Sequence, residues 1–128
     1  SRFINEARLW RKRLGGGMRQ AGIVAAAGLL ALEESPARLL EDHDKARLLA
    51  KGLAAHAGLA IDPEKVVTNI AFFDTSGTGR TAEDICEALE GEGVLAGGSG
   101  HSVRMVTHRD VSADDIRRTV AAVGRVLG

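Results

Sequence analysis

An almost wholly apolar segment, residues 18–34, constrains the fold of this chain more than any other feature of the sequence. A helix that is apolar on every side has to be buried on every side. A chain of 128 residues rarely has a core deep enough to surround one helix, so the segment predicts a covering surface that the chain itself does not supply. Residues 21–32 make up only about twelve positions, short of the ~20 that a membrane span requires, so we expect a buried helix.

The charge balance excludes some classes of partner. Seventeen Lys and Arg residues cancel seventeen Asp and Glu residues, so the chain lacks the basic surface that selects nucleic acid or an anionic membrane. The single cysteine, Cys86, cannot form an internal disulfide, which favours a reducing compartment. No secretory signal opens the sequence. We therefore expect a cytoplasmic protein that binds neither nucleic acid nor a membrane.

A short basic helix and a glycine hinge are predicted before the apolar segment. Residues 1–14 intersperse aromatic and aliphatic side chains with arginines and Lys12, a pattern typical of an amphipathic helix. The glycines at 15–17 end this helix, because residues without a Cβ favour turns. They resemble a phosphate-binding loop only weakly, since they follow a helix and lack the Lys-Ser/Thr ending of such loops. We interpret them as a hinge.

Residues 35–128 predict one small α/β domain, and residues 1–34 a helical segment with a glycine-rich hinge that lies between domains. Ser35 and Pro36 have the character of an N-cap and a first helical residue, so a new helix is expected to begin there and to stop by Gly58. The β-branched and aromatic run at 66–73 predicts a central strand. A brief strand is predicted at 94–96, followed by a flexible glycine-rich stretch at 97–100.

Two capping boxes and one alternating strand complete the pattern. Thr81 with Asp84, and Ser112 with Asp115, each place a hydroxyl three residues before a carboxylate, which predicts the start of a helix. Residues 102–108 alternate between apolar and polar positions, which predicts a half-buried strand. The resulting order of elements is typical of helices packed on a small sheet.

Arg104 is the residue that most resembles a binding group. Strand alternation turns it away from the face that Val103 and Met105 bury, so its guanidinium must reach either solvent or an anion. Arginine holds a carboxylate through two parallel hydrogen bonds, and Arg104 could therefore bind a substrate carboxylate. From the residues alone, a solvated or salt-bridged arginine is the favoured alternative.

The histidines and the cysteine do not form a pattern of metal ligands or of a catalytic pair. His43, His56, His101 and His108 lack the i, i+4 spacing of helical metal ligands, and the one cysteine adds nothing to them, so no metal site is predicted. Cys86 has no neighbouring base in the sequence and is expected to be a buried thiol. No catalytic residue is predicted in this chain.

Four blocks of the sequence resemble the low-specificity threonine aldolases. Residues 10–22, with the run Gly-Gly-Gly-Met-Arg-Gln, resemble the segment that follows the cofactor lysine in that family. Residues 39–43 resemble a family helix, Thr68 and Asn69 the entry to its central strand, and residues 103–108 its penultimate strand. The blocks occur in the family's order along essentially the whole chain.

The resemblance implies the small carboxy-terminal domain of a fold-type-I pyridoxal-phosphate enzyme of the β-eliminating lyase superfamily, with a mostly antiparallel sheet and a buried interdomain helix before it. Such enzymes cleave L-threonine or L-allo-threonine to glycine and acetaldehyde, and they usually work as tetramers built from dimers. Arg104 matches the arginine that binds the substrate carboxylate. Lys12 and Arg19 match residues near the cofactor or at a subunit contact.

The cofactor half of such an enzyme is missing from the sequence. Lys12, Lys45 and Lys51 do not lie in the family's cofactor-lysine context, so that lysine is expected to precede residue 1, in an amino-terminal large domain. Without it, the chain alone is expected to be inactive. Two alternatives are the small domain of another fold-type-I lyase and a non-catalytic α/β module that binds a ligand or mediates assembly.

Overall fold

The computed structural model describes residues 1–128 as two compact units, Ser1–Pro36 and Ala37–Gly128. In the first unit, helix α1 (Arg2–Arg13) begins at Ser1, whose hydroxyl accepts a hydrogen bond from the backbone N–H of Ile4. It ends before Gly15, which has a φ of +87°. The basic helix and the glycine break are thus confirmed. The assignment of 1–34 and 35–128 as separate domains stays a prediction.

Helix α2 (Gly22–Ala54) runs through the position where a break was predicted. The expected new start at Ser35 and Pro36 is wrong, because Pro36 lies inside one continuous helix. Proline lacks the N–H that would bond four residues back, so the helix forgoes that bond and continues. Alanines and leucines on both sides favour the helical state strongly enough to carry it across.

The amino-terminal part of α2 is exposed throughout this chain. Every residue from 18 to 34 is exposed, and the relative accessibility of Ile23 reaches 83%. The carboxy-terminal part differs, because Ala46, Leu49 and Leu53 are buried. The cover that was predicted for residues 18–34 is therefore not found within the first unit. No helix combines the length and the apolar character that crossing a membrane would demand.

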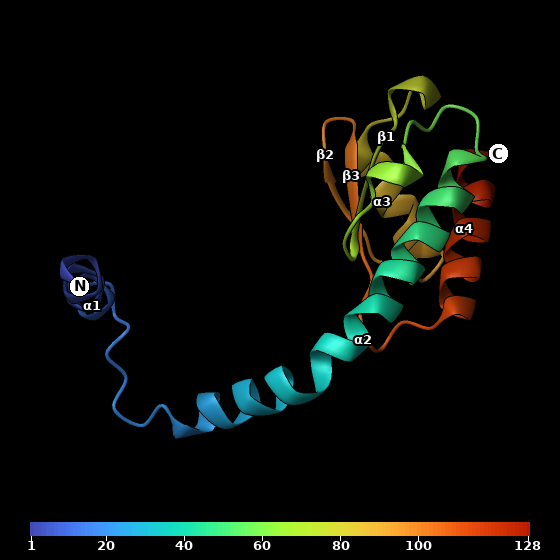
Figure 1. The fold of residues 1–128 in the computed structure, drawn as a ribbon. Helices are drawn as coiled ribbons and strands as arrows, with labels where there is room; N and C mark the ends of the chain where they lie inside the picture. The colour runs from blue at the N-terminus through green and yellow to red at the C-terminus, as the bar shows by residue number, and fades with distance from the viewer. The chain divides into compact units, whose positions relative to one another are not determined.

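The second unit is a three-stranded antiparallel sheet with helices on one face. Its strands β1 (Ile70–Asp74), β2 (Gly97–Ser99) and β3 (Ser102–Val106) lie in the order β1-β3-β2. Helices α3 (Ala82–Gly91) and α4 (Ala113–Leu127) and the end of α2 lie on the same side of it (Figure 1). Two short 3-10 turns occupy Pro63–Lys65 and Ser76–Thr78. The predicted α/β class is confirmed.

Strand bounds are where the sequence prediction was wrong. β1 begins at Ile70 rather than at residue 66, because residues 63–65 form a 3-10 turn first. Residues 94–96 are not a strand, and Gly97–Ser99 form β2 instead of a flexible stretch. Pairing with β3 is the reason, since Gly97 lies opposite Arg104 and Ser99 opposite Ser102. A strand that short is fixed by its partner and not by its own residues.

Both capping boxes are confirmed and shift the acidity of their carboxylates. Thr81 and Ser112 each accept a hydrogen bond from the backbone N–H three residues later, and the carboxylates bond back. Hydrogen bonds from Ser112, with a smaller contribution from Arg118, lower the pKa of Asp115 to about 2. Hydrogen bonds from Thr81 lower the pKa of Asp84 in the same way. The carboxylates of Asp84 and Asp115 are thus ionised at neutral pH, in the first turn of their helices, where negative charge is favourable.

The close crossing of α2 and α4 gives a stability prediction. A Cβ at Gly52 would lie 2.5 Å from Cγ2 of Val120, so Gly52→Ala has to displace a packed side chain. Alanine gains about 1 kcal/mol of helix propensity, but overpacking costs about 1–3 kcal/mol, so we expect a net loss of stability. Urea unfolding measures it. Gly91→Ala in α3, where a Cβ meets nothing within 4 Å, should instead increase stability.

Candidate functional site

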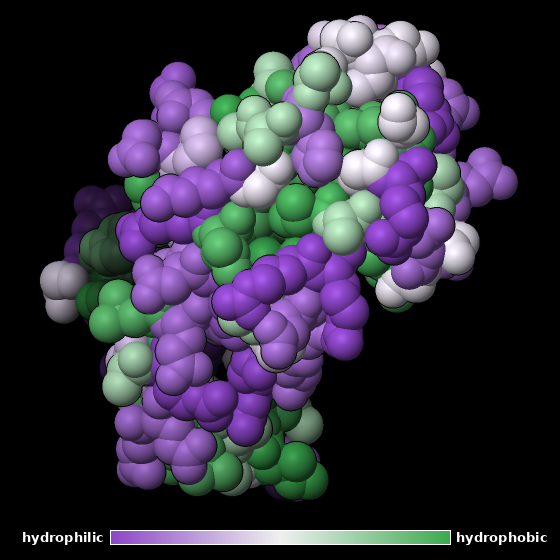
Figure 2. Space-filling model, turned by 90° about the vertical axis from the view of Figure 1, so that its right-hand side faces the viewer, coloured by the Kyte–Doolittle hydropathy of each residue, from purple (hydrophilic) through white to green (hydrophobic).

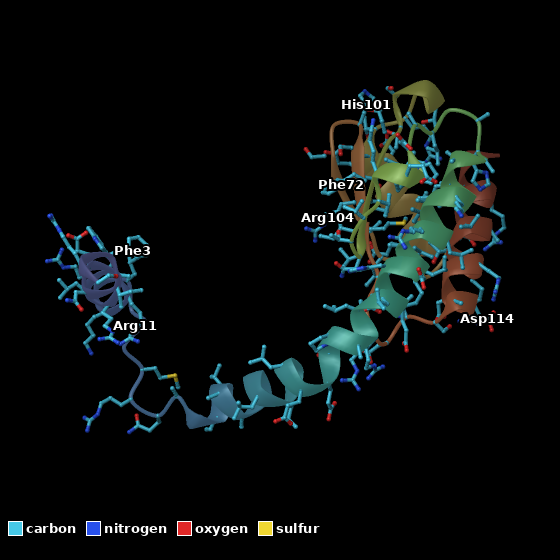
Figure 3. All side chains as sticks on the ribbon, in the orientation of Figure 1. Phe3, Arg11, Phe72, His101, Arg104 and Asp114 are labelled. Carbon is cyan, nitrogen blue, oxygen red and sulfur yellow. The ribbon has the colours of Figure 1, made fainter.

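Arg104 lies at the centre of the uncovered face of the sheet. It belongs to the middle strand β3, whose residues alternate as predicted, with Val103 and Met105 buried and Arg104 exposed. Phe72 of β1 lies directly opposite it on one side, and Gly97 of β2 on the other. Phe72 and Arg104 both lie on the side of the sheet away from α2 and α4 (Figure 3).

The guanidinium of Arg104 is not engaged by any group of this chain. Several other arginines of the second unit are engaged: Arg125 pairs with Glu92 at 2.7 Å, and Arg80 donates to the carbonyl of Val126 at 2.7 Å. Arg38 and Arg109 are free as well, but neither lies in a strand of the sheet. Arg104 forms no hydrogen bond or ion pair, although the sheet fixes its backbone on both sides. A free guanidinium on a strand that is paired on both sides can bind an anion through two parallel hydrogen bonds.

Lys12 and Arg19 belong to the first unit. Lys12 lies in the last turn of α1, and its side chain lies against Gly17, where a Cβ would come within 2.6 Å of the lysine Nζ. Arg19 is exposed in the irregular segment between α1 and α2. Arg104 belongs to the second unit. The roles of Lys12 and Arg19 near the cofactor or at a subunit contact stay predictions.

The lysines of this chain do not fit covalent binding of pyridoxal phosphate. Such a lysine has to present an uncharged amine in a pocket. Lys45, the one lysine that is largely buried, donates its Nζ to the carbonyls of His108 and Val111 and pairs with Asp42 at 2.6 Å, so its amine is already engaged by three groups of the chain. Lys12, Lys51 and Lys65 are exposed. The four lysines of this chain therefore do not match the cofactor lysine that the resemblance implies.

The structure does not join the histidines and Cys86 into a site. No three His, Cys, Asp or Glu residues are grouped so that they could hold a metal ion. His56 packs against Gly124 of α4, and its Nε2 is buried without a hydrogen-bond partner. Cys86 is half-buried in α3, and burial raises the pKa of its thiol, which disfavours a reactive thiolate.

A concavity of the second unit lies away from Arg104. It has a volume of about 700 Å³ and lies between α4, the end of β3 and the loop before β2, and Arg104 does not line it. On the α4 side of the molecule, hydrophobic side chains gather at the centre and hydrophilic ones border them (Figure 2). A smaller depression of about 570 Å³ follows the β1 edge and includes Phe72. Arg104 thus presents its charge on an open surface.

A polar cluster at the end of β3 was missed by the sequence analysis. Besides Lys45, it contains Thr107, whose hydroxyl donates to the carbonyl of Asp42 at 2.7 Å, and Asn69, whose amide donates to the carbonyl of Thr107 at 2.8 Å. These bonds join α2 to the strand that carries Arg104. The i, i+3 spacing of Asp42 and Lys45 was visible in the sequence, but the carbonyls to which Lys45 donates lie more than sixty residues away.

Comparison with known proteins identifies related sequences along nearly the whole chain. Residues 1–76 match the model of a family described as beta-eliminating lyase. Low-specificity L-threonine aldolase 1 of Arabidopsis thaliana is 40% identical over 127 residues, which are 98% of this chain and 36% of that relative. The low specificity L-threonine aldolase of Escherichia coli K12 is 41% identical over 119 residues, 93% of this chain and 34% of that relative. The aldolase vrtJ of Penicillium aethiopicum is 32% identical over 121 residues, 92% of this chain and 30% of that relative. The chain thus spans about a third of the length of these curated relatives.

Proposed function

Because this chain belongs to the beta-eliminating lyase family, we propose that it is the carboxy-terminal part of a pyridoxal-phosphate-dependent threonine aldolase. In the complete protein, the reaction would cleave L-threonine or L-allo-threonine to glycine and acetaldehyde. The observation that carries the proposal is the free guanidinium of Arg104 on the uncovered face of the sheet, in a chain whose relatives are named as threonine aldolases.

Arg104 is proposed to hold the α-carboxylate of the amino acid. A guanidinium and a carboxylate form two parallel charge-assisted hydrogen bonds, which fix both the position and the orientation of the substrate. Pairing with β1 and β2 holds the strand, so the arginine meets the substrate from a fixed backbone. Orientation of this kind supports catalysis because it reduces the entropy lost on reaching the transition state.

The cofactor is proposed to be held by residues outside this chain, with Lys12 and Arg19 near it or at a subunit contact. Pyridoxal phosphate, when bound, serves as an electron sink that stabilises negative charge at the α-carbon of the amino acid. The lysines described above do not supply its covalent anchor. This chain alone is therefore proposed to be inactive, and its part is to bind and orient the carboxylate.

The exposed amino-terminal part of α2 supports a large domain as the partner. Ile23, Val24 and Leu32 are each at least 65% exposed, and large apolar patches of this kind mark interaction surfaces. The relatives are long enough to supply such a domain, because two thirds of their length lies outside the match. Assembly into a tetramer of two dimers in the cytoplasm is part of the same proposal.

Purified proteins with and without the cofactor half test the proposal. The complete polypeptide should bind pyridoxal phosphate, with an absorbance band in the visible range, and should release glycine and acetaldehyde from L-threonine. The 128-residue chain with added cofactor should give neither the band nor glycine. A complete protein that binds the cofactor but releases pyruvate or ammonia from other amino acids would identify a different lyase. One that binds no cofactor would contradict the proposal altogether.

A further inference from the structure

The two cross-strand neighbours of Arg104 differ sharply in size. Phe72, on β1, has a large aromatic ring that is 58% exposed, whereas Gly97, on β2, has no side chain. Residues directly opposite each other in an antiparallel pair share a face, with Cβ atoms about 5 Å apart. The guanidinium of Arg104 therefore extends from a strand that is flanked by an aromatic ring on one side and by bare backbone on the other.

Neither packing nor backbone geometry requires glycine at position 97. A Cβ at Gly98 would lie 2.8 Å from Cβ of Ala82 in α3, so residue 98 points toward the helices and residue 97 toward the open face. A Cβ at Gly97 would meet no atom within 4 Å, and its φ is not in the left-handed region. Glycine inside a strand weakens the strand and often marks a place where a ligand approaches closely.

Phe72 gives the opposite side of the arginine a different character. Its aromatic side chain lies on the same face of the sheet as Arg104, at the directly paired position of β1. The neighbouring β1 edge is apolar as well, because Ile70 and Val66 line the same depression as Phe72. The β1 side of Arg104 is therefore apolar and bulky, whereas the β2 side is bare backbone.

We infer that the carboxylate of a small amino acid binds Arg104 from the Gly97 side, in the space that the absent side chain leaves open, rather than from the side that bears the Phe72 ring. Residue 97 is then a determinant of access to the guanidinium, although glycine itself offers no side-chain contact. The inference rests on the proposed function, in which Arg104 holds the substrate carboxylate.

Substitution of Gly97 in the complete protein tests the inference, with stability and binding read separately. Gly97→Val should leave the melting temperature unchanged or raise it, because valine favours strands and meets no neighbour. The KM for L-threonine should rise by at least about tenfold, as expected when alkyl groups fill a substrate's space, and Gly97→Ala should give a smaller rise. Gly91→Ala, where an added Cβ is equally unhindered, is the matched control and should leave KM unchanged.

Two further measurements separate failure of this inference from failure of the proposed function. If Arg104→Gln raises KM but both Gly97 variants leave it unchanged, access from the Gly97 side is wrong while the arginine's role stands. Sodium acetate serves as an activity-independent probe by NMR, with sodium chloride at equal ionic strength as the control. In this chain, acetate should shift the NMR signals of the Arg104 Nε–H and of the backbone amide of residue 97. In Gly97→Val, acetate should shift neither signal. Persistence of these shifts in a complete protein without aldolase activity would overturn the proposed reaction alone, and their absence from the parent chain would overturn the inference.

Discussion

Replacing Arg104 by glutamine in the complete protein is expected to raise the KM for L-threonine by about 100-fold, which corresponds to about 3 kcal/mol. The reason is that a neutral amide can replace neither the charge nor the paired hydrogen bonds that a guanidinium offers to a carboxylate. Stability should hardly change, because Arg104 is exposed and forms no ion pair or hydrogen bond within the chain. Steady-state kinetics and thermal unfolding of the same preparations measure both quantities.

Arg104→Lys is the informative companion, because it keeps the charge but loses the planar fork. We expect a KM between those of the parent protein and Arg104→Gln. Arg117→Gln on α4 is the matched control, since Arg117 is also exposed but pairs with Asp114. It should change neither KM nor kcat. An unchanged KM in Arg104→Gln, with the protein folded, would show that the carboxylate is bound elsewhere.

Replacing Lys45 by methionine is expected to lower the stability of this chain by about 3 kcal/mol, the cost of leaving a largely buried charge without its partner. Lys45 and Asp42 are only 12% and 14% exposed and lie 2.6 Å apart. The same Nζ also donates to the carbonyls of His108 and Val111. The substitution would leave the Val111 carbonyl without a donor, whereas the His108 carbonyl would keep the backbone N–H of Val111. For a unit of this size, the melting temperature should fall by more than about 10 °C.

A second ion pair on the same helix, two residues further along, offers a control for this prediction. Arg47 pairs with Asp44 at the same i, i+3 spacing, but their side chains are 49% and 76% exposed. Arg47→Met should therefore cost no more than about 0.5 kcal/mol, because solvent weakens exposed ion pairs. The double variant Asp42→Asn, Lys45→Met should recover part of the loss, since it removes the unpaired carboxylate. Equal effects of Lys45→Met and Arg47→Met would contradict the structural role of Lys45.

Local sequence signals predicted the starts of α3 and α4 and the alternating strand correctly, although the start expected at Ser35 and Pro36 was wrong. Thr81 and Ser112 cap their helices through atoms at most three residues away, so their pattern is complete within one turn. The exposure of Arg104 followed from alternation along its own strand. Where pairing over distance decides, the prediction was wrong: residues 94–96 have more strand-forming side chains than Gly97–Ser99, yet only the latter lie opposite β3.

The sequence by itself determined the family, the α/β class and the outward direction of Arg104. These follow from the order of motifs, the apolar periodicity and the alternation of residues, which are all visible along the linear sequence. Only the tertiary structure showed that α2 continues through Pro36, that Lys45 serves carbonyls more than sixty residues away, and that the neighbours of Arg104 are Phe72 and Gly97. These features depend on which distant segments meet. Strand register and buried partners are fixed by packing of the whole unit, and no local pattern encodes them.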